Sequence, residues 1–251
     1  MPYPSLRTKA AMTEGTKIHL VALSDLGLFL KSAHTDRLIG QWRNTKDGRF
    51  AFEKAYGELE DPWASADPRY RYQANKYAHL MECLPTGRRF ACALDIGCGL
   101  GTLSIQLAER ANQVIGIDIA QAAVDLAIDR ASEYCNIMFQ QASILELPAT
   151  FERRFDLVVI ADVLYYLPAP IKTSLLNSLA TSVAQLLVPG GLCLLADHYF
   201  IAIDPASRLS RRIHNAFIHL PQLRVRLEAR RPFYVVTLLE RVGITQENAR
   251  G

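Results

Sequence analysis

A glycine-rich loop, placed where an apolar run turns into a helical pattern, constrains the fold of this chain most. The run at positions 91–96 leads into glycines at alternate positions, Gly97, Gly99 and Gly101. Glycine there lets backbone N–H groups approach a ligand closely and removes the steric cost of the turn. A dinucleotide-binding GxGxxG loop would have its third glycine one residue later, where Thr102 stands. The carboxylate of Asp95, just before the loop, suits a cationic amino group better than a pyrophosphate.

Apolar runs of strand length alternate with helical patterns from this loop onward. The expected strands are 91–96, 113–117, 136–141, 155–160, 192–196, 223–229 and 233–239. The expected helices are 102–110, 121–134, 171–188 and 207–219. Pro189-Gly190-Gly191 is predicted to end the third of these helices, and Arg230-Arg231-Pro232 to join the last two strands. This order predicts a Rossmann-like, doubly wound α/β fold with a mostly parallel seven-stranded sheet whose last strand is antiparallel.

The residues before the sheet divide into an extension and a helical lid. Residues 1–47 mix polar turns with one apolar run, 18–30, which is expected to form a short packed helix or strand and is too short to span a membrane. Residues 48–88 have a helical pattern that Pro62 and Pro68 interrupt, because proline forces the preceding residue out of the helical conformation. We therefore expect a single domain overall, with residues 89–251 as its core.

The charge balance and the cysteines exclude several classes of protein. The 28 Lys and Arg residues against 25 Asp and Glu give a formal net charge of +3, which calls for neither nucleic acid nor an anionic membrane. The five cysteines form no CxxC pair, and no histidine lies at zinc-finger spacing from any of them. We expect neither a disulfide scaffold nor a metal site, and we expect a reducing, cytoplasmic location.

Polar residues at the ends of the next strands are candidates for ligand binding. Asp118 ends the second strand, where an acid in a doubly wound fold accepts hydrogen bonds from ribose hydroxyls, although it also suits an N-cap for the helix near Ala120. Ala142 and Ser143 follow the third strand, at the position that faces an adenine in such folds, although Ser143 also suits a simple turn. The buried strand at 155–160 leads into a loop at the same sheet edge, where open α/β sheets bind ligands.

Together these motifs resemble the class I S-adenosylmethionine-dependent methyltransferases. The resemblance spans residues 91–197 and rests on the D-x-G-x-G-x-G loop, Asp118, the Phe155-Asp156-Leu157-Val158 strand and the L-x-P-G-G turn before the fifth strand. A narrower resemblance joins residues 52–77 and the segment 162–167 to the NodS-type branch, the N-methyltransferases of nodulation-factor glucosamine. The N-terminus of this chain is longer than that branch usually shows.

The resemblance implies S-adenosyl-L-methionine as the cofactor, S-adenosyl-L-homocysteine as its product, and a role for particular residues. Asp95 and the glycine loop would hold the methionine amino and carboxylate groups, and Asp118 would hold the ribose. Ile119 would pack on the adenine, and Trp63 would close over the cofactor as part of a lid, although a core anchor between helices suits Trp63 equally well. The implied cofactor-binding set is Asp95, Gly97, Cys98, Gly99, Gly101, Asp118, Ile119, Ala142, Ser143, Ala161, Trp63 and Tyr72.

A sulfonium methyl group is already activated, so the protein has to position the acceptor and exclude water. An amine acceptor must be uncharged, and a carboxylate, tyrosine or histidine can take its proton. The candidates for this catalytic role are Asp162, Tyr165, Tyr166 and His198. A capping role suits His198 equally well, and both tyrosines also suit stacking on a sugar or plain packing.

Seven arginines fall between positions 208 and 231, where the only acid is Glu228. Such a cluster can bind an anionic group on a substrate. A solvated helix face and strand edge explains the charges more simply, and we prefer that interpretation, although Arg208, Arg211 and Arg212 would share one helix face.

The leading hypothesis is a methyltransferase that acts on a small molecule in a biosynthetic pathway, by N-methylation of an amino sugar or a similar amine. An O-methyltransferase of a sugar or natural product is the first alternative. A tRNA or protein methyltransferase is disfavoured, because this chain lacks the NPPY-type motif expected after the fourth strand of such an enzyme. The glycine spacing disfavours an NAD-dependent oxidoreductase, and the intact loop disfavours a non-catalytic cofactor-binding protein. We expect a small-molecule substrate, no nucleic acid and no membrane as partners, and the oligomeric state stays open.

Overall fold

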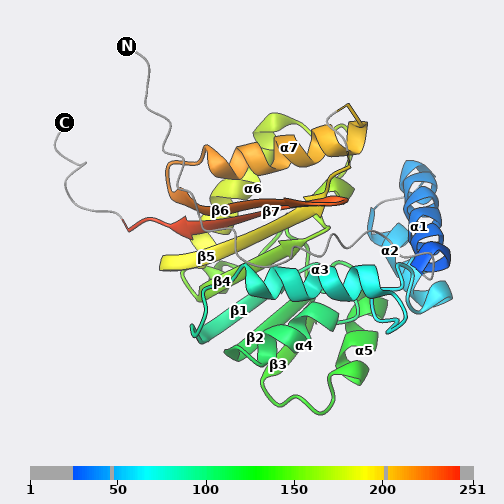
Figure 1. The fold of residues 1–251 in the computed structure, drawn as a ribbon, viewed down its shortest axis with the longest axis horizontal. Coiled ribbons are helices and arrows are strands. Elements are labelled where there is room, and N and C mark those ends of the chain that lie inside the picture. Colours follow the sequence, from blue (N-terminus) through cyan, green and yellow to red (C-terminus); the bar gives the residue numbers. More distant parts are fainter. Residues whose placement is uncertain (1–24, 46–47, 201–202, 244–251) are drawn as a thin grey trace, which may run out of the picture.

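The computed structural model describes residues 25–45, 48–200 and 203–243 (Figure 1). Within these residues one seven-stranded sheet has the order β3-β2-β1-β4-β5-β7-β6. Its strands are β1 (Phe90–Ile96), β2 (Ala111–Asp118), β3 (Ile137–Gln141), β4 (Phe155–Ala161), β5 (Leu187–His198), β6 (Leu223–Arg231) and β7 (Tyr234–Arg241). β7 runs antiparallel to both of its neighbours, β5 and β6, and the other pairs are parallel. The predicted fold class is confirmed.

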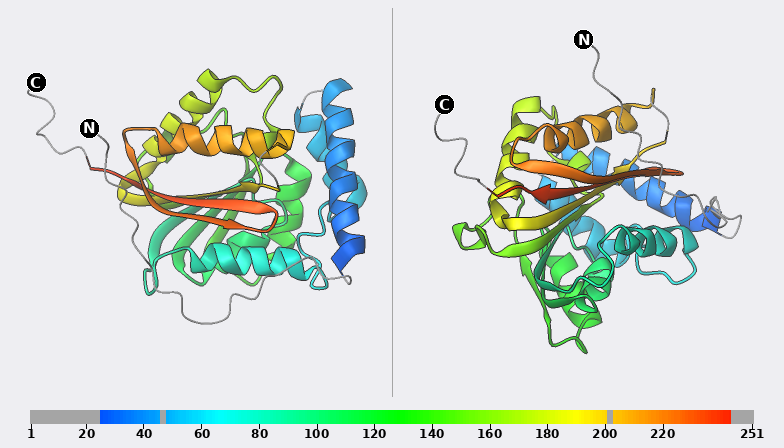
Figure 2. Two further views of the ribbon diagram at one scale, coloured as in Figure 1. Left: turned by 45° about the horizontal axis from the view of Figure 1, so that its top comes forward. Right: turned by 60° about the vertical axis from the view of Figure 1, so that its left-hand side comes forward.

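Helices cover both faces of this sheet and also lie across one end of its strands (Figure 2). They are α1 (Leu26–Thr45), α2 (Gly48–Leu59), α3 (Arg71–Glu82), α4 (Thr102–Ala108), α5 (Gln121–Arg130), α6 (Thr173–Leu186) and α7 (Pro205–Ile218). Two short 3-10 helices, η2 (Ala149–Phe151) and η3 (Leu164–Tyr166), flank β4. α6 and α7 lie on one face of the sheet, α3, α4 and α5 lie on the other, and α1 and α2 lie across the end of the strands. No helix within the described part of the chain has the length and apolarity needed to cross a membrane.

The core follows from the two-residue period of buried parallel strands. In β4, Val158 and Ile160 pack on the face covered by α6, and Leu157 and Val159 pack on the opposite face. A strand buried on both faces is apolar at nearly every position, and β4 accordingly shows a continuous apolar run. This double burial fixes the register of the sheet, because a shift by one residue would exchange its two faces.

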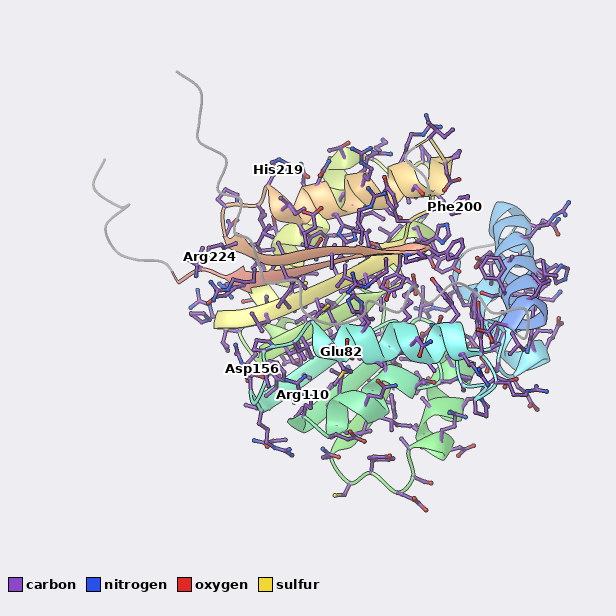
Figure 3. The ribbon with its side chains drawn as sticks, in the orientation of Figure 1. Glu82, Arg110, Asp156, Phe200, His219 and Arg224 are labelled. Atoms are coloured by element: carbon purple, nitrogen blue, oxygen red, sulfur yellow. The ribbon has the colours of Figure 1, made fainter. Side chains whose placement is uncertain are left out.

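Polar side chains close the sheet edge that lies away from α1 (Figure 3). The carboxylate of Asp156 accepts hydrogen bonds from the backbone N–H groups of Ala91 and Cys92 at 2.8 and 2.9 Å. Arg110 donates to the carbonyl of Met81 at 2.8 Å, at the end of α3. These contacts leave the carboxyl ends of the strands, on the opposite side, as the edge that is open to a ligand.

The N-terminal helices are joined to the core through carboxylates at helix amino ends. Glu53 of α2 accepts hydrogen bonds from the backbone N–H groups of Gln121 and Ala122 at 2.9 and 2.8 Å, and so caps α5. Asp25 accepts one from the N–H of Tyr72 at 3.0 Å, at the start of α3. The described residues 25–45 therefore lie in one layer with the lid expected over 48–88. Residues 18–24 of the apolar run lie outside the described residues.

The prediction that Pro189-Gly190-Gly191 ends a helix is wrong, because these residues lie inside β5. α6 stops earlier, at Leu186, and the strand begins at once. The register between β4 and β5 shifts across Phe155 and Leu157, which marks an irregularity where extra residues of β5 are accommodated. A Cβ on Gly191 would lie 2.8 Å from the carbonyl oxygen of Val188, so this irregularity requires glycine.

Glu53→Ala should lower the free energy of unfolding by about 1 kcal/mol, because it removes the side chain that caps α5. Glu58→Ala is the matched control on the same helix, since Glu58 is exposed and its nearest cation, Lys54, lies 3.8 Å away. The control should change stability by no more than ~0.5 kcal/mol. Urea denaturation of both variants measures the difference, and equal losses would show that the cap carries no stability.

Candidate active site

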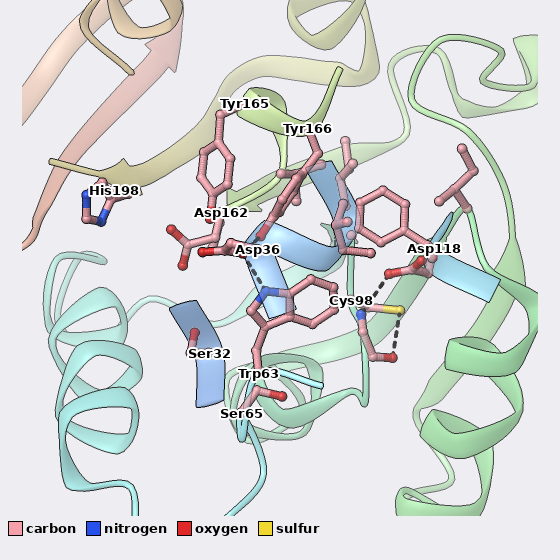
Figure 4. A pocket seen from close by; sticks show the side chains of 18 of the residues that line it. Ser32, Asp36, Trp63, Ser65, Cys98, Asp118, Asp162, Tyr165, Tyr166 and His198 are labelled. Atoms are coloured by element: carbon pink, nitrogen blue, oxygen red, sulfur yellow. Dashed lines mark hydrogen bonds between the residues drawn. The ribbon is translucent and has the colours of Figure 1, made fainter. Parts of the chain in front are cut away.

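A cavity of about 610 Å³ lies at the carboxyl ends of the parallel strands. Each βα connection begins at this edge, so residues far apart in sequence meet there. All residues expected at the site line this cavity except Asp95 and Gly101. The lining residues from this set are Trp63, Tyr72, Gly97, Cys98, Gly99, Asp118, Ile119, Ala142, Ser143, Ala161, Asp162, Tyr165 and His198. α1, α2 and α3 supply the wall that faces the sheet (Figure 4).

The glycine loop requires glycine for two reasons, the positive φ angles of its residues and the lack of room for a Cβ atom. Gly97 has φ of +74°, and a Cβ there would lie 2.3 Å from a methyl group of Val163. Gly99 has φ of +51°, and a Cβ there would lie 2.8 Å from the hydroxyl of Tyr56. Gly101 begins α4, packs behind the loop, and does not line the cavity. A side chain at either of the first two positions would enter space that the cavity wall occupies, so the loop keeps its backbone at the ligand surface.

Asp118 fastens the glycine loop to the start of α5. Its two carboxylate oxygens accept hydrogen bonds from the backbone N–H groups of Gly99 and Ala120, both at 3.0 Å. Burial raises the pKa of Asp118 to about 6. The bond to Ala120 is the capping contact considered as an alternative, yet the residue also lines the cavity. Because each carboxylate oxygen can accept more than one hydrogen bond, capping leaves room for ribose hydroxyls.

Asp95 lies behind the loop instead of facing the cavity. Its carboxylate is buried and accepts a hydrogen bond from Ser104 Oγ of α4 at 2.6 Å. Burial, with a further contribution from the charge of Asp118, raises the pKa of Asp95 to about 6. The alternation of strand side chains points this residue toward α4, whereas Leu94 and Ile96 point to the other face. Any effect of Asp95 on a ligand would therefore act through Ser104 and the loop.

Asp162 is held by a residue that the sequence analysis did not single out. Lys76 of α3 is buried, and its ammonium pairs with the carboxylate of Asp162. Its Nζ also lies 5.3 Å from the ring centroid of Tyr234. Asp162 has φ of 59°, and its N–H donates to the carbonyl of Ala196 at 2.8 Å. This unusual backbone conformation directs the paired carboxylate into the cavity. Asp162 is thus suited to position a ligand, because its pairing with Lys76 holds the carboxylate in place.

Asp36 of α1 is a third carboxylate at the cavity, in addition to Asp118 and Asp162, and it was not expected from the sequence. Trp63 Nε1 donates to Asp36 Oδ1 at 2.8 Å, and the hydroxyl of Tyr166 donates to the same oxygen. In the described residues neither of these bonds uses Oδ2. The surrounding protein raises the pKa of Asp36, the two hydrogen bonds oppose this, and the charge of Asp162 raises it further. A single aspartate in a helical segment gave no sequence signal for this position.

Aromatic rings flank this carboxylate, whose residue is exposed. Phe52 of α2 stacks on Trp63 at 6.0 Å between centroids and meets Tyr166 edge-on at 5.2 Å. Trp63 and Tyr166 are 5.9 Å apart. Trp63 therefore packs between helices, as in the core role considered for it, and it also lines the cavity. Its closing over the cofactor stays a prediction. Rings with negative faces beside carboxylates attract cations.

His198 ends β5 and points into the cavity near Asp162 (Figure 4). Its neighbour Asp197 points to the other face, where it is fully buried and lies 3.2 Å from His214 Nε2 of α7. His214 Nδ1 in turn lies 2.7 Å from Thr237 Oγ1. This buried pair fixes the end of β5 and thereby the direction of His198. Among the described residues, no group of three or more His, Cys, Asp or Glu side chains is placed to hold a metal ion.

A family model described as "Methyltransferase domain" matches residues 91–224, which is more than half of the chain. Ubiquinone biosynthesis O-methyltransferase of Alkalilimnicola ehrlichii is 32% identical over 153 residues, which cover 59% of this chain and 58% of that protein. Nodulation protein S of Bradyrhizobium diazoefficiens is 28% identical over 109 residues, which cover 43% of this chain and 50% of that protein. The match thus spans less than two thirds of the length of these relatives.

A solved structure agrees in fold over most of the chain. The crystal structure of N-methyltransferase NodS from Bradyrhizobium japonicum WM9 in complex with S-adenosyl-L-homocysteine superposes with a TM-score of 0.62. The superposition covers 84% of this chain and 98% of that chain, at 17% sequence identity. At this identity the likeness concerns the fold alone.

Asp118→Asn should weaken binding of S-adenosyl-L-homocysteine at least tenfold, because a charged hydrogen bond contributes ~1.5–3 kcal/mol. The asparagine keeps the shape of the side chain. Asp125→Asn, an exposed carboxylate on α5, is the control and should bind as the unaltered protein does. Titration calorimetry measures both variants, and unchanged affinity in a folded Asp118→Asn protein would exclude Asp118 as the ribose ligand.

Proposed function

The chain belongs to the class I S-adenosylmethionine-dependent methyltransferases, and we propose that it methylates an amine on a polar, sugar-like small molecule. The match to the family model shows the family membership, and the fold agrees with it. The acceptor is the new element, and the observation that carries it is the charge of the cavity. Asp36 and Asp162 both line the cavity, and Lys76 is the one lysine or arginine among the described lining residues. Because Lys76 pairs with Asp162, Asp36 is left to attract a cation.

The residues at the glycine loop fit the cofactor by shape. Glycine at positions 97 and 99 places no side chain between the loop backbone and the cavity, and Asp118 also lines the cavity. S-adenosyl-L-methionine supplies an activated methyl group when it is bound. Asp118 would bind its ribose, Ile119 would pack on the adenine, and Ala142 and Ser143 would lie at the adenine edge. Ala161 would contact the methionine portion, and Tyr72 would help to close the lid.

The acceptor end has to position an amine and remove its proton. The aromatic cluster of Phe52, Trp63 and Tyr166 limits water there, and the two carboxylates orient a cationic group. Orientation of this quality contributes ~7–11 kcal/mol of barrier reduction. An ammonium has no lone pair, so a group on the enzyme must take its proton. Asp36 is suited to this step, because its raised pKa makes it a better proton acceptor than an ordinary surface carboxylate. His198 and Tyr165 line the same space as further acceptors.

Relatives support two acceptor classes. The match to nodulation protein S favours an amine, in keeping with the narrower resemblance to the NodS-type N-methyltransferases. The ubiquinone biosynthesis O-methyltransferases favour a hydroxyl group, and a hydroxyl acceptor is the second candidate. The carboxylates and the aromatic rings of the cavity favour the amine, because an ammonium group gains charge attraction and cation–π contact there, whereas a neutral hydroxyl gains only hydrogen bonds. A methyl-transfer screen with glucosamine, simple primary amines and catechols separates the two.

Asp36→Asn should lower kcat/KM for glucosamine roughly ten- to hundredfold, because it removes a charged hydrogen bond worth ~1.5–3 kcal/mol. The asparagine oxygen still accepts from Trp63 and Tyr166, so affinity for S-adenosyl-L-homocysteine should stay within about twofold. The deficit should shrink as the pH rises through the pKa of the amine, since the acceptor then arrives uncharged.

Two results would contradict this account. Turnover of catechols without turnover of any amine would replace the amine by a hydroxyl acceptor. If Asp36→Asn lost as much affinity for S-adenosyl-L-homocysteine as it loses in kcat/KM, Asp36 would be only a structural contact.

A further inference from the structure

A second groove adjoins the candidate active site. It has a volume of about 980 Å³ and is lined by α1, by the segment from Tyr165 to Ile171, and by α7. The amino end of α7 points toward α1, whereas His219 marks its far end (Figure 3). Gly40, Tyr165, Leu167 and Pro168 line both the groove and the active-site cavity. The groove and the cavity therefore share part of one wall.

The groove gathers three positive charges from two separate parts of the chain. Arg37 comes from α1, and Arg208 and Arg212 stand one turn apart on the same face of α7. Arg212 donates to the carbonyl of Ile171 at 2.7 Å, which holds its guanidinium beside the loop. Arg208 and Arg212 are exposed, in keeping with the solvated face preferred from the sequence, and the groove adds the exposed Arg37 of α1 to them.

These charges have no counterion among the described residues. No aspartate or glutamate lines the groove, and no carboxylate of the described chain lies within 4.0 Å of any of the three guanidinium groups. Like charges gathered in one groove repel one another unless an anion joins them. Guanidinium groups match the oxygens of phosphoryl groups in paired hydrogen bonds, and a phosphoryl group carries about −1.5 to −2 charges at neutral pH.

We propose that this groove binds a phosphoryl group of the methyl acceptor, so that the substrate is a phosphorylated amine. The proposal rests on the proposed function, because the amine would lie in the adjoining cavity between Asp36 and Asp162. The substrate would then carry opposite charges at its two ends, and the enzyme would match each end with the opposite sign. The cavity would select the amine, and the groove would set the direction in which the molecule enters.

The test compares glucosamine 6-phosphate with glucosamine as methyl acceptors, in the full-length protein and in the double variant Arg208→Gln/Arg212→Gln. We expect the unaltered protein to prefer the phosphorylated sugar at least tenfold in kcat/KM, and the double variant to lose that preference. Arg211→Gln is the matched control, since Arg211 lies on α7 between the two and does not line the groove. The control should keep the preference. Equal turnover of both sugars by the unaltered protein, or an equal loss in the control, would overturn the proposal.

A binding measurement separates a failure of this proposal from a failure of the proposed function. Inorganic pyrophosphate, titrated calorimetrically into the protein saturated with S-adenosyl-L-homocysteine, should bind to the unaltered chain and to Arg211→Gln but at least tenfold more weakly to the double variant. This result would support the phosphoryl-binding role of the groove even if no amine is methylated.

Absence of pyrophosphate binding to the unaltered chain would overturn that role. Turnover of unphosphorylated amines would then still support the proposed function. Equal binding to all three proteins would place the anion elsewhere and would also overturn it.

Discussion

Carboxylates at the amino ends of helices hold the N-terminal layer over the open edge of the sheet, and the ligand cavity depends on them. Parallel strands leave their carboxyl ends at one edge, which by itself is an open trough. Glu53 caps α5 from α2, and Asp25 caps the start of α3. Each cap contributes only about 1 kcal/mol, yet together with the aromatic contacts between Phe52, Trp63 and Tyr166 they give the trough a further wall.

The two ends of this space have different origins. The end that we propose for the cofactor is built by the sheet, where short loops and the hydrogen bonds of Asp118 leave the backbone little freedom. The end that we propose for the acceptor is built by α1, α3 and the residues after β4, which bring Asp36, Lys76 and Asp162 together from three distant parts of the sequence. Such a division lets one fold keep its cofactor while the elements outside the sheet set the acceptor.

The features that follow from local chemistry were predictable, and those that depend on distant contacts were not. The strands of the parallel sheet are apolar at successive positions, and the glycine loop has its own spacing, so both were found. Pro189-Gly190-Gly191 was taken as a helix stop because the irregularity between β4 and β5 depends on pairing with a strand far away. Asp95 was expected at the ligand, but the face that a strand residue points to depends on the neighbouring helix α4. The ion pair between Lys76 and Asp162 joins residues 86 positions apart in the sequence and has no local pattern.

The central claim is that α1 is part of the site, so that the sheet edge and the whole N-terminal layer enclose one ligand. Hydrogen exchange of the full-length protein, with and without saturating S-adenosyl-L-homocysteine, tests this most directly. The account predicts slower exchange in α1 as well as in α2, α3 and the glycine loop when the ligand binds. Slower exchange in the glycine loop with no change in α1 would contradict it, because the cofactor would then bind without the layer that supplies Asp36.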